Sequence, residues 1–254
     1  MGLFDKKYCS ICGEKIGFLG NRKLEDGNLC KDCAAKLSPW FSDRRQSTVE
    51  DIRAQLAYRE ENRAAVAAFH VTRSLGENTK ILLDEDAGKF MVTHARDLAA
   101  ANPDVLDFSQ VTGVDIDIDE DRSEEYTTDK DNKRVSCNPP RYSFHYDFRI
   151  VIRVNHPYFD EIRFKLNNTS VETTPPGGVI LMRKPNPAIH PYYKAYADMA
   201  QEIKTILTDA RREARDAAKA SAAPKTAVTC PWCGATTIPD ERGCCEYCGG
   251  SLNG

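Results

Sequence analysis

The chain has 254 residues, of which 41% are hydrophobic and 29% are charged, as in a globular protein with one large domain or a medium domain with small appendages. Its formal net charge of −3 argues against a general nucleic-acid-binding surface, which usually carries a basic excess. No apolar run approaches the roughly 18–20 residues that span a bilayer, and the start lacks the apolar core of a secretory signal. We therefore expect a cytoplasmic protein with reduced thiols.

Charge is distributed unevenly along the sequence. The first 45 residues carry nine Lys and Arg against six Asp and Glu, a local net of +3. Residues 115–125 carry seven acids against the single base Arg122, a local net of −6.

Two C-x-x-C pairs lie in residues 1–40, Cys9/Cys12 and Cys30/Cys33, with 17 residues between them. This pattern indicates a zinc site, because zinc prefers four soft donors in a tetrahedron and two tight turns supply two thiolates each. Gly13 follows the first pair, where a small residue lets backbone amides approach the sulfurs. Disulfides would suit a secreted chain, and a redox C-x-x-C would lie in a thioredoxin-like alternation of strands and helices; the sequence shows neither. Iron–sulfur ligation is the remaining alternative.

The segment between and after these pairs has a recognisable plan. Gly20-Asn21 and Asp26-Gly27 are turn signals that predict a hairpin, and CKDCAAKL predicts a short helix ending near Ser38-Pro39. Knuckle, hairpin and helix-borne knuckle together resemble a treble clef. They also resemble the small zinc domain at the front of Clp-type unfoldases, which implies protein binding and dimerisation. With the following STVEDIRAQLAYREEN, the segment resembles an uncharacterised bacterial domain family that precedes diverse modules, a resemblance that implies no activity.

Residues 41–68 are predicted to form a connector helix. Ser47 or Thr48 is a suitable N-cap, and acids follow in the first turn. The middle of the helix, from Arg59 to Arg63, is strongly charged, so we expect a solvated face rather than a DNA-reading one. The apolar residues form only a partial stripe: Val49, Ile52, Leu56, Val66 and Phe69.

Residues 69–220 are predicted to form an antiparallel β domain, because the apolar period changes to two from about residue 70. KILLDEDAGKFMVTH predicts two short strands around Asp86-Ala87-Gly88. In RYSFHYDFRIVIRVNHP, seven alternate apolar residues from Tyr142 to Val154 share one face, and DEIRFKLNN repeats the pattern. Residues 121–140 and 173–178 are polar or proline-rich and are predicted to be loops, the first of them mobile.

A predicted helix follows the strands and supplies a stripe to cover them. Its apolar residues recur at helical spacing: Tyr192, Tyr196, Met199, Ile203 and Leu207. The expected fold class is therefore α+β. Antiparallel strands closed by one C-terminal helix resemble a pleckstrin-homology-like (PH-like) roll or barrel in its bacterial form, an architecture shared by lipid-binding and protein-binding modules. A different α+β roll fits the pattern nearly as well.

Residues 221–254 are predicted to be a linker around Pro224 and a second zinc module. Its pairs, Cys230/Cys233 and Cys245/Cys248, are 11 residues apart, and a glycine follows each pair. The module resembles a zinc ribbon with a short hairpin between its knuckles. Cys244 is expected to be a bystander, since only Cys245 keeps the two-residue spacer to Cys248.

Other residues that resemble functional motifs have simpler structural explanations. Asp115, Asp117 and Asp119 resemble the start of a calcium loop, but its sixth and twelfth positions hold Glu120 and Tyr126 instead of Gly and Glu. Their alternation with apolar residues favours the solvated face of a strand. The five histidines adjoin no local nucleophile motif, Cys137 lacks a recognisable base, and no glycine-rich phosphate loop is present.

These patterns favour a cytoplasmic adaptor or sensor rather than an enzyme, with no catalytic residue assigned. Its partner would be a protein or a membrane lipid, bound by the central domain, with nucleic acid disfavoured. The expected cofactors are two structural zinc ions in closed sites with no position for reactive water. The eight expected ligands are Cys9, Cys12, Cys30, Cys33, Cys230, Cys233, Cys245 and Cys248.

One alternative is nucleic-acid binding by the C-terminal ribbon, although residues 224–254 hold two bases and three acids. The other is an enzyme with an unrecognised site in the β domain.

Overall fold

The computed structural model describes residues 6–222, 227–240 and 242–252. The chain divides into two compact units, residues 1–212 and 213–254, and each is described by itself. The predicted linker around Pro224 lies outside the described residues, and the predicted division at residues 40, 68 and 220 stays a proposal. None of the described helices is both long and apolar enough to cross a membrane.

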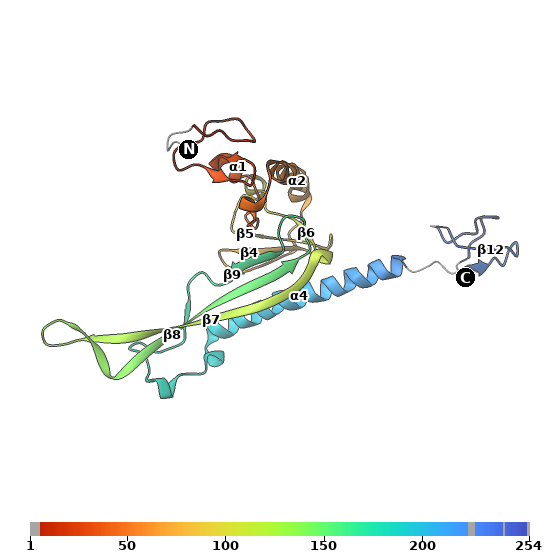
Figure 1. Ribbon diagram of the computed structural model, residues 1–254. Helices are drawn as coiled ribbons and strands as arrows, with labels where there is room; N and C mark the ends of the chain where they lie inside the picture. The colour runs from red at the N-terminus through yellow and green to blue at the C-terminus, as the bar shows by residue number, and fades with distance from the viewer. Residues whose placement is uncertain (1–5, 223–226, 241, 253–254) are drawn as a thin grey trace. The chain divides into compact units, whose positions relative to one another are not determined.

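The N-terminal part of the first unit is a small module followed by a long helix (Figure 1). Two short strands of two residues each form a hairpin, which confirms the turn predicted at Asp26-Gly27. Thr48 caps the long helix through a capping box with Asp51. The elements are β1 (Arg22–Lys23), β2 (Asn28–Leu29), α1 (Lys31–Ala34), η1 (Arg44–Gln46) and α2 (Val49–Ala68).

Two antiparallel sheets follow, and neither closes into a barrel among the described strands. The first has the order β3-β4-β5-β6, formed by β3 (Arg73–Leu75), β4 (Lys80–Asp84), β5 (Lys89–Thr93) and β6 (Leu106–Asp107). In the second, β8 (Arg134–Val154) pairs with β7 (Val111–Thr128), β9 (Glu161–Lys165) and β10 (Val171–Glu172). The remaining elements are α3 (Leu98–Ala101), η2 (Phe108–Gln110), η3 (Leu181–Arg183), η4 (Pro187–Ile189), α4 (Pro191–Ala222), β11 (Val228–Thr229) and β12 (Thr236–Thr237).

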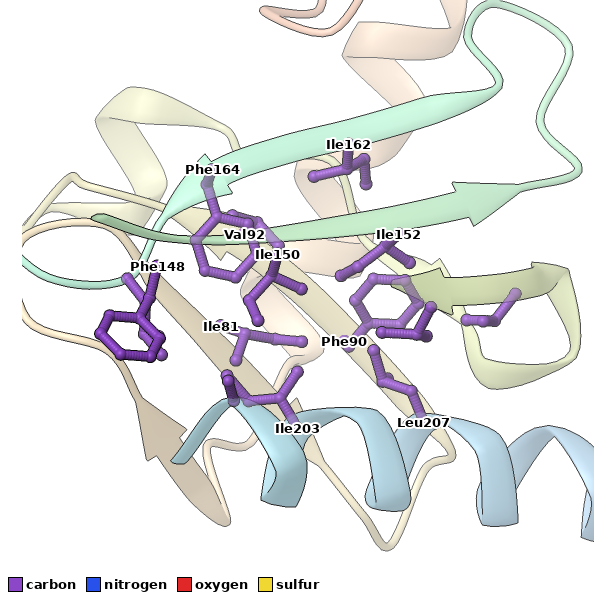
Figure 2. Packing of buried hydrophobic residues seen from close by; sticks show 14 of the residues in the cluster. Ile81, Phe90, Val92, Phe148, Ile150, Ile152, Ile162, Phe164, Ile203 and Leu207 are labelled. Atoms are coloured by element: carbon purple, nitrogen blue, oxygen red, sulfur yellow. The ribbon is translucent and has the colours of Figure 1, made fainter. Parts of the chain in front are cut away.

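One hydrophobic core joins both sheets to α4 (Figure 2). Ile81 and Phe90 from the first sheet meet Phe148 and Ile150 of β8, and Ile203 of α4 packs against them; all five are at most 1% exposed. The alternation predicted for residues 142–154 is confirmed, since every apolar position from Phe144 to Val154 is buried and Tyr142 is half-buried.

The helical stripe needs one correction. Tyr192 is 70% exposed, whereas Tyr193 lies over β8 with its ring centroid 5.0 Å from those of Tyr146 and Phe148. Two adjacent tyrosines at the start of a helix point in directions about 100° apart, so only one of them can face the sheet.

The expected solvated face of β7 is present and is neutralised by arginines. Asp115 and Asp119 form ion pairs with Arg153 and Arg149 of the neighbouring strand β8, and Asp117 pairs with Arg163 of β9, on the far side of β8. These cross-strand pairs account for the aspartates without a calcium ion.

The loop expected at residues 121–140 is instead the end of a long hairpin (Figure 1). β7 and β8 stay paired to Thr128 and Arg134, with only residues 129–133 in the turn, beyond the reach of β9 and β10. The Arg134 guanidinium lies 3.9 Å from the Tyr126 ring centroid on the neighbouring strand. We call residues 122–141 the arm. Its polar sequence misled the prediction because both faces meet solvent, so no apolar alternation marks the strands.

The expected solvated face of α2 is present at Glu60, Glu61 and Arg63, which are exposed. It does not include Arg59 and Asn62, which are 6% and 4% exposed. Arg59 Nη1 donates to Asp104 Oδ1 at 2.7 Å, and the Asp104 side chain is fully buried. Arg59 also donates to the carbonyl oxygens of Lys36 and Asn102.

The same carboxylate receives hydrogen bonds from the N-terminal module and from α2. Ser38 Oγ donates to Asp104 Oδ2 at 2.8 Å, and the Tyr58 hydroxyl donates to Oδ1 at 3.3 Å. Asn62 Nδ2 donates to Asn102 Oδ1 and to the carbonyl of Pro103, both at 2.8 Å. We call this set of polar side chains the junction network. It connects the N-terminal module and α2 to the segment that leads into β6.

Candidate metal centres

The first cysteine cluster is built from a β-knuckle and a helix N-terminus. The Cys9 amide donates to the carbonyl of Glu14, and the Gly13 amide returns to the carbonyl of Cys9, both at 2.9 Å. Gly13 has φ +75°, which suits a residue without Cβ and closes the turn. Cys30 caps α1, and Cys33 lies in its first turn, so the helix presents both thiols on one side.

Backbone amides surround these sulfurs. The Cys30 amide donates to Cys9 Sγ, and the Cys33 amide donates to Cys30 Sγ, both at 3.3 Å. The module has its own small core of Ile16, Leu24, Leu29 and Leu37, to which α2 contributes the fully buried Ile52. The cluster therefore lies on the module's core, with Cys9, Cys30 and Cys33 buried and Cys12 exposed.

The second cluster, in the C-terminal unit, repeats the knuckle twice. The Cys230 amide donates to the carbonyl of Ala235, and the Cys245 amide to that of Gly250, both at 2.8 Å. β11 and β12 pair on either side of the first knuckle, so the knuckle itself is the turn of the hairpin. The short hairpin expected between the knuckles is thus placed around the first one.

The sulfur spacing fits a single tetrahedral ion. The four Sγ atoms of each cluster lie within 4.8 Å of one another. The Cys12–Cys30, Cys230–Cys248 and Cys233–Cys245 Sγ pairs are 3.7, 3.6 and 3.7 Å apart. Four sulfurs each about 2.3 Å from a central zinc would be about 3.8 Å apart. A disulfide needs about 2.05 Å, and a multi-iron cluster lies between its sulfurs and spreads them further apart.

The thiol pKa values differ in direction within the first cluster. Burial alone would raise the pKa of Cys9, but the amides of Cys12, Cys30 and Ile11 lower it to about 6. Burial raises the pKa of Cys33 well above its usual range, and the neighbouring thiols contribute to the increase, with Cys30 having the largest effect among them. One thiol thus ionises readily while another resists, and a bound cation lets all four act as thiolates.

The second cluster shows the same contrast. Amide donors at Cys233 and Trp232 outweigh the effect of burial and lower the pKa of Cys230 to about 7. The Gly250 amide favours the Cys248 thiolate, but the neighbouring Cys233 thiol and burial raise its pKa to about 12.

The structure brings together the eight cysteines named from the sequence, four in each cluster. Zinc is the ion that suits them, and ligation by each thiolate stays a prediction. Neither cluster includes Cys244, whose Sγ lies 3.8 Å from the carbonyl oxygen of Arg242, or Cys137, which is half-buried in the arm.

Sequence reasoning missed the junction network beside the first cluster. No local pattern indicates this network, because Arg59 and Asp104 are 45 residues apart and each resembles an ordinary surface charge in its own segment.

Comparisons with known proteins reach only the N-terminal part. Residues 7–55 match a family model described as "Domain of unknown function (DUF4428)". The match covers the first cysteine cluster and the start of α2. No curated protein matches the chain, and no solved structure matches it.

Proposed function

We propose that the protein is a zinc-stabilised adaptor whose central PH-like domain binds a protein partner along the outer edge of β7. The PH-like reading is supported by a run of four consecutive antiparallel strands, then β7, β8 and β9, then a helix packed on the shared core. The zinc modules are structural in this proposal, because four-cysteine sites leave no open position on the metal.

The observation that carries the proposal is the edge of β7. This 18-residue strand pairs with β8 alone among the described strands. Edge strands expose backbone donors and acceptors that an extended partner segment can pair with. Asp121, Glu124 and Glu125 of β7 form no ion pair within the described residues, so they would disfavour self-association of this edge and attract a basic partner.

The register identifies which backbone groups face outward. Phe148 of β8 uses its backbone on the β9 side, where its carbonyl accepts from Leu166 and its N–H donates to Asn167 Oδ1, both at 2.8 Å. Its partner across the ladder is Ile118. Because such a pair directs its backbone groups away from each other, the N–H and carbonyl of Ile118 point to the outer edge.

The lining of the cavity beside the junction network gives little support to the hypothesis that the protein is an enzyme. This cavity of about 610 Å³ has Trp40, His94 and Arg163 on its wall, but no Asp, Glu or Cys. It therefore offers no thiol nucleophile and no carboxylate base, and its Ser38 hydroxyl already donates to Asp104.

The test is affinity capture from native lysate with zinc-intact protein and two variants at one position. Ile118→Pro removes an outward N–H without touching the bonds to β8, and Ile118→Ala removes only the side chain. A partner retained by the wild type and by Ile118→Ala but lost by Ile118→Pro supports strand addition. Equal capture by the wild type and both variants would refute the edge as the binding surface.

A further inference from the structure

The N-terminal module carries a basic hollow outside its metal centre. The segment around β1 and the short helix η1 enclose a cavity of about 740 Å³, lined by residues 21–25, Arg44 and Arg45. The hollow is held in shape by Arg44 Nη1, which donates to the carbonyl of Lys23 at 3.3 Å.

Within the described residues, the cations of this hollow form no ion pairs with acids. Arg22, Lys23, Arg44 and Arg45 line it with Glu25 as the sole acid, and none of the four forms an ion pair within the described part of the chain. Burial, together with the positive charges of Arg22 and Arg45, lowers the pKa of Arg44. Cations gathered in this way repel one another, and a multivalent anion between them would relieve the repulsion.

An apolar tip adjoins the hollow. Phe18 and Leu19 are 88% and 84% exposed in a tight turn closed by the Gly20 amide and the carbonyl of Gly17. Arg22 Nη1 donates to the carbonyl of Leu19 at 3.4 Å, so the tip and the basic wall are in direct contact. Two large apolar side chains at a loop tip, beside unpaired cations, are the features of a peripheral membrane-binding surface.

We propose that this face of the zinc module docks on an anionic lipid bilayer, with Phe18 and Leu19 inserted among the acyl chains and the hollow holding a phosphate-bearing headgroup. The charge is complementary to phosphate, which also occurs in free anions and nucleic acids. The apolar tip selects the bilayer, because only a bilayer provides an apolar phase next to the phosphates. This surface is separate from the β7 edge, so either proposal can fail alone.

The test is sedimentation of the full zinc-loaded chain with phosphatidylcholine vesicles, with and without phosphatidylserine, at low and high salt. We expect binding only to the anionic vesicles, weakened by salt. Arg22→Gln and Arg44→Gln should each lower the partition coefficient about fivefold, the factor that one basic residue near an anionic surface contributes. Phe18→Ala with Leu19→Ala should lower it at least about tenfold.

Matched controls lie elsewhere in the same unit. Lys130→Gln removes an exposed charge at the turn of the arm, and Met182→Ala removes a side chain that is 93% exposed. Both should bind like the wild type, and zinc content should confirm that every variant is folded. Three results would overturn the proposal: equal binding to neutral vesicles, losses for Met182→Ala that match those of the tip, or tight binding to a short duplex or to inorganic phosphate without vesicle binding.

Discussion

The junction network supports the sharpest prediction, because it places an ion pair where a solvated helix face was expected. Replacing Arg59 with methionine keeps the aliphatic volume but removes the guanidinium. Asp104 would then remain fully buried with two hydroxyl donors and no cation, and the carbonyls of Lys36 and Asn102 would each lose a donor. Breaking a buried pair from one side costs about 3–5 kcal/mol, a large part of the stability of an ordinary domain.

Arg63, one turn further along α2, provides a matched control. It pairs with Glu60 at 2.9 Å, but both side chains are more than half exposed. Arg63→Met should therefore change the free energy of unfolding by less than about 0.5 kcal/mol.

The assay is urea unfolding of the zinc-loaded chain, followed by the fluorescence of Trp40, whose amide donates to Ser38 Oγ inside the network. Removing both charges, with Arg59→Met and Asp104→Leu together, should cost less than the sum of the two single changes, because no unpaired charge remains. Equal costs for Arg59→Met and Arg63→Met would refute the argument that the junction network couples the zinc module to the β domain.

Three further predictions concern the metal, the core and pH. Elemental analysis of protein purified without added metal should find about two zinc ions per chain, and one zinc ion or stoichiometric iron would contradict the assignment. Phe148→Ala, at a fully buried site, should cost about 3–5 kcal/mol in a denaturant melt, whereas Arg149→Ala should cost about 0.5 kcal/mol; equal costs would mean that the faces of β8 are misassigned. Burial lowers the pKa of His156 below its usual value, so the folded state favours the neutral ring. The stability that depends on the neutral ring should be present above pH about 6.5 and lost as pH falls through the lower folded pKa. His156→Gln should reduce that loss in paired urea melts, and an unchanged pH dependence would show that His156 is not responsible.

The sequence predicted the features that depend on local pattern. Thiol spacing alone grouped the eight cysteines, because a metal-binding knuckle is a short turn with a fixed number of residues. The faces of β8 followed from alternation, since one face must be buried and a slip of one residue would reverse it. The capping of α2 by Thr48 followed from the residue types at its first turn.

The missed features depend on partners far away in the sequence. Arg59 looks like part of a solvated face until Asp104 comes within reach across 45 residues. The arm contains few apolar residues and is a strand because β7 and β8 continue their ladder past the core. In each case the structure depends on a tertiary contact, which the helical or strand periodicity of the local sequence cannot predict.

The junction network also links the first metal centre to the β domain. A module of about forty residues has a small core, so we expect its folding free energy to depend on a metal ion bound by the first cluster. Lys36 and Ser38, which follow α1 and Cys33, contribute a carbonyl and a hydroxyl to the pair of Arg59 and Asp104. Loss of the first zinc would therefore withdraw two hydrogen-bond partners from a buried ion pair. The second cluster belongs to the other unit, so a zinc ion bound there would stabilise the fold of that unit.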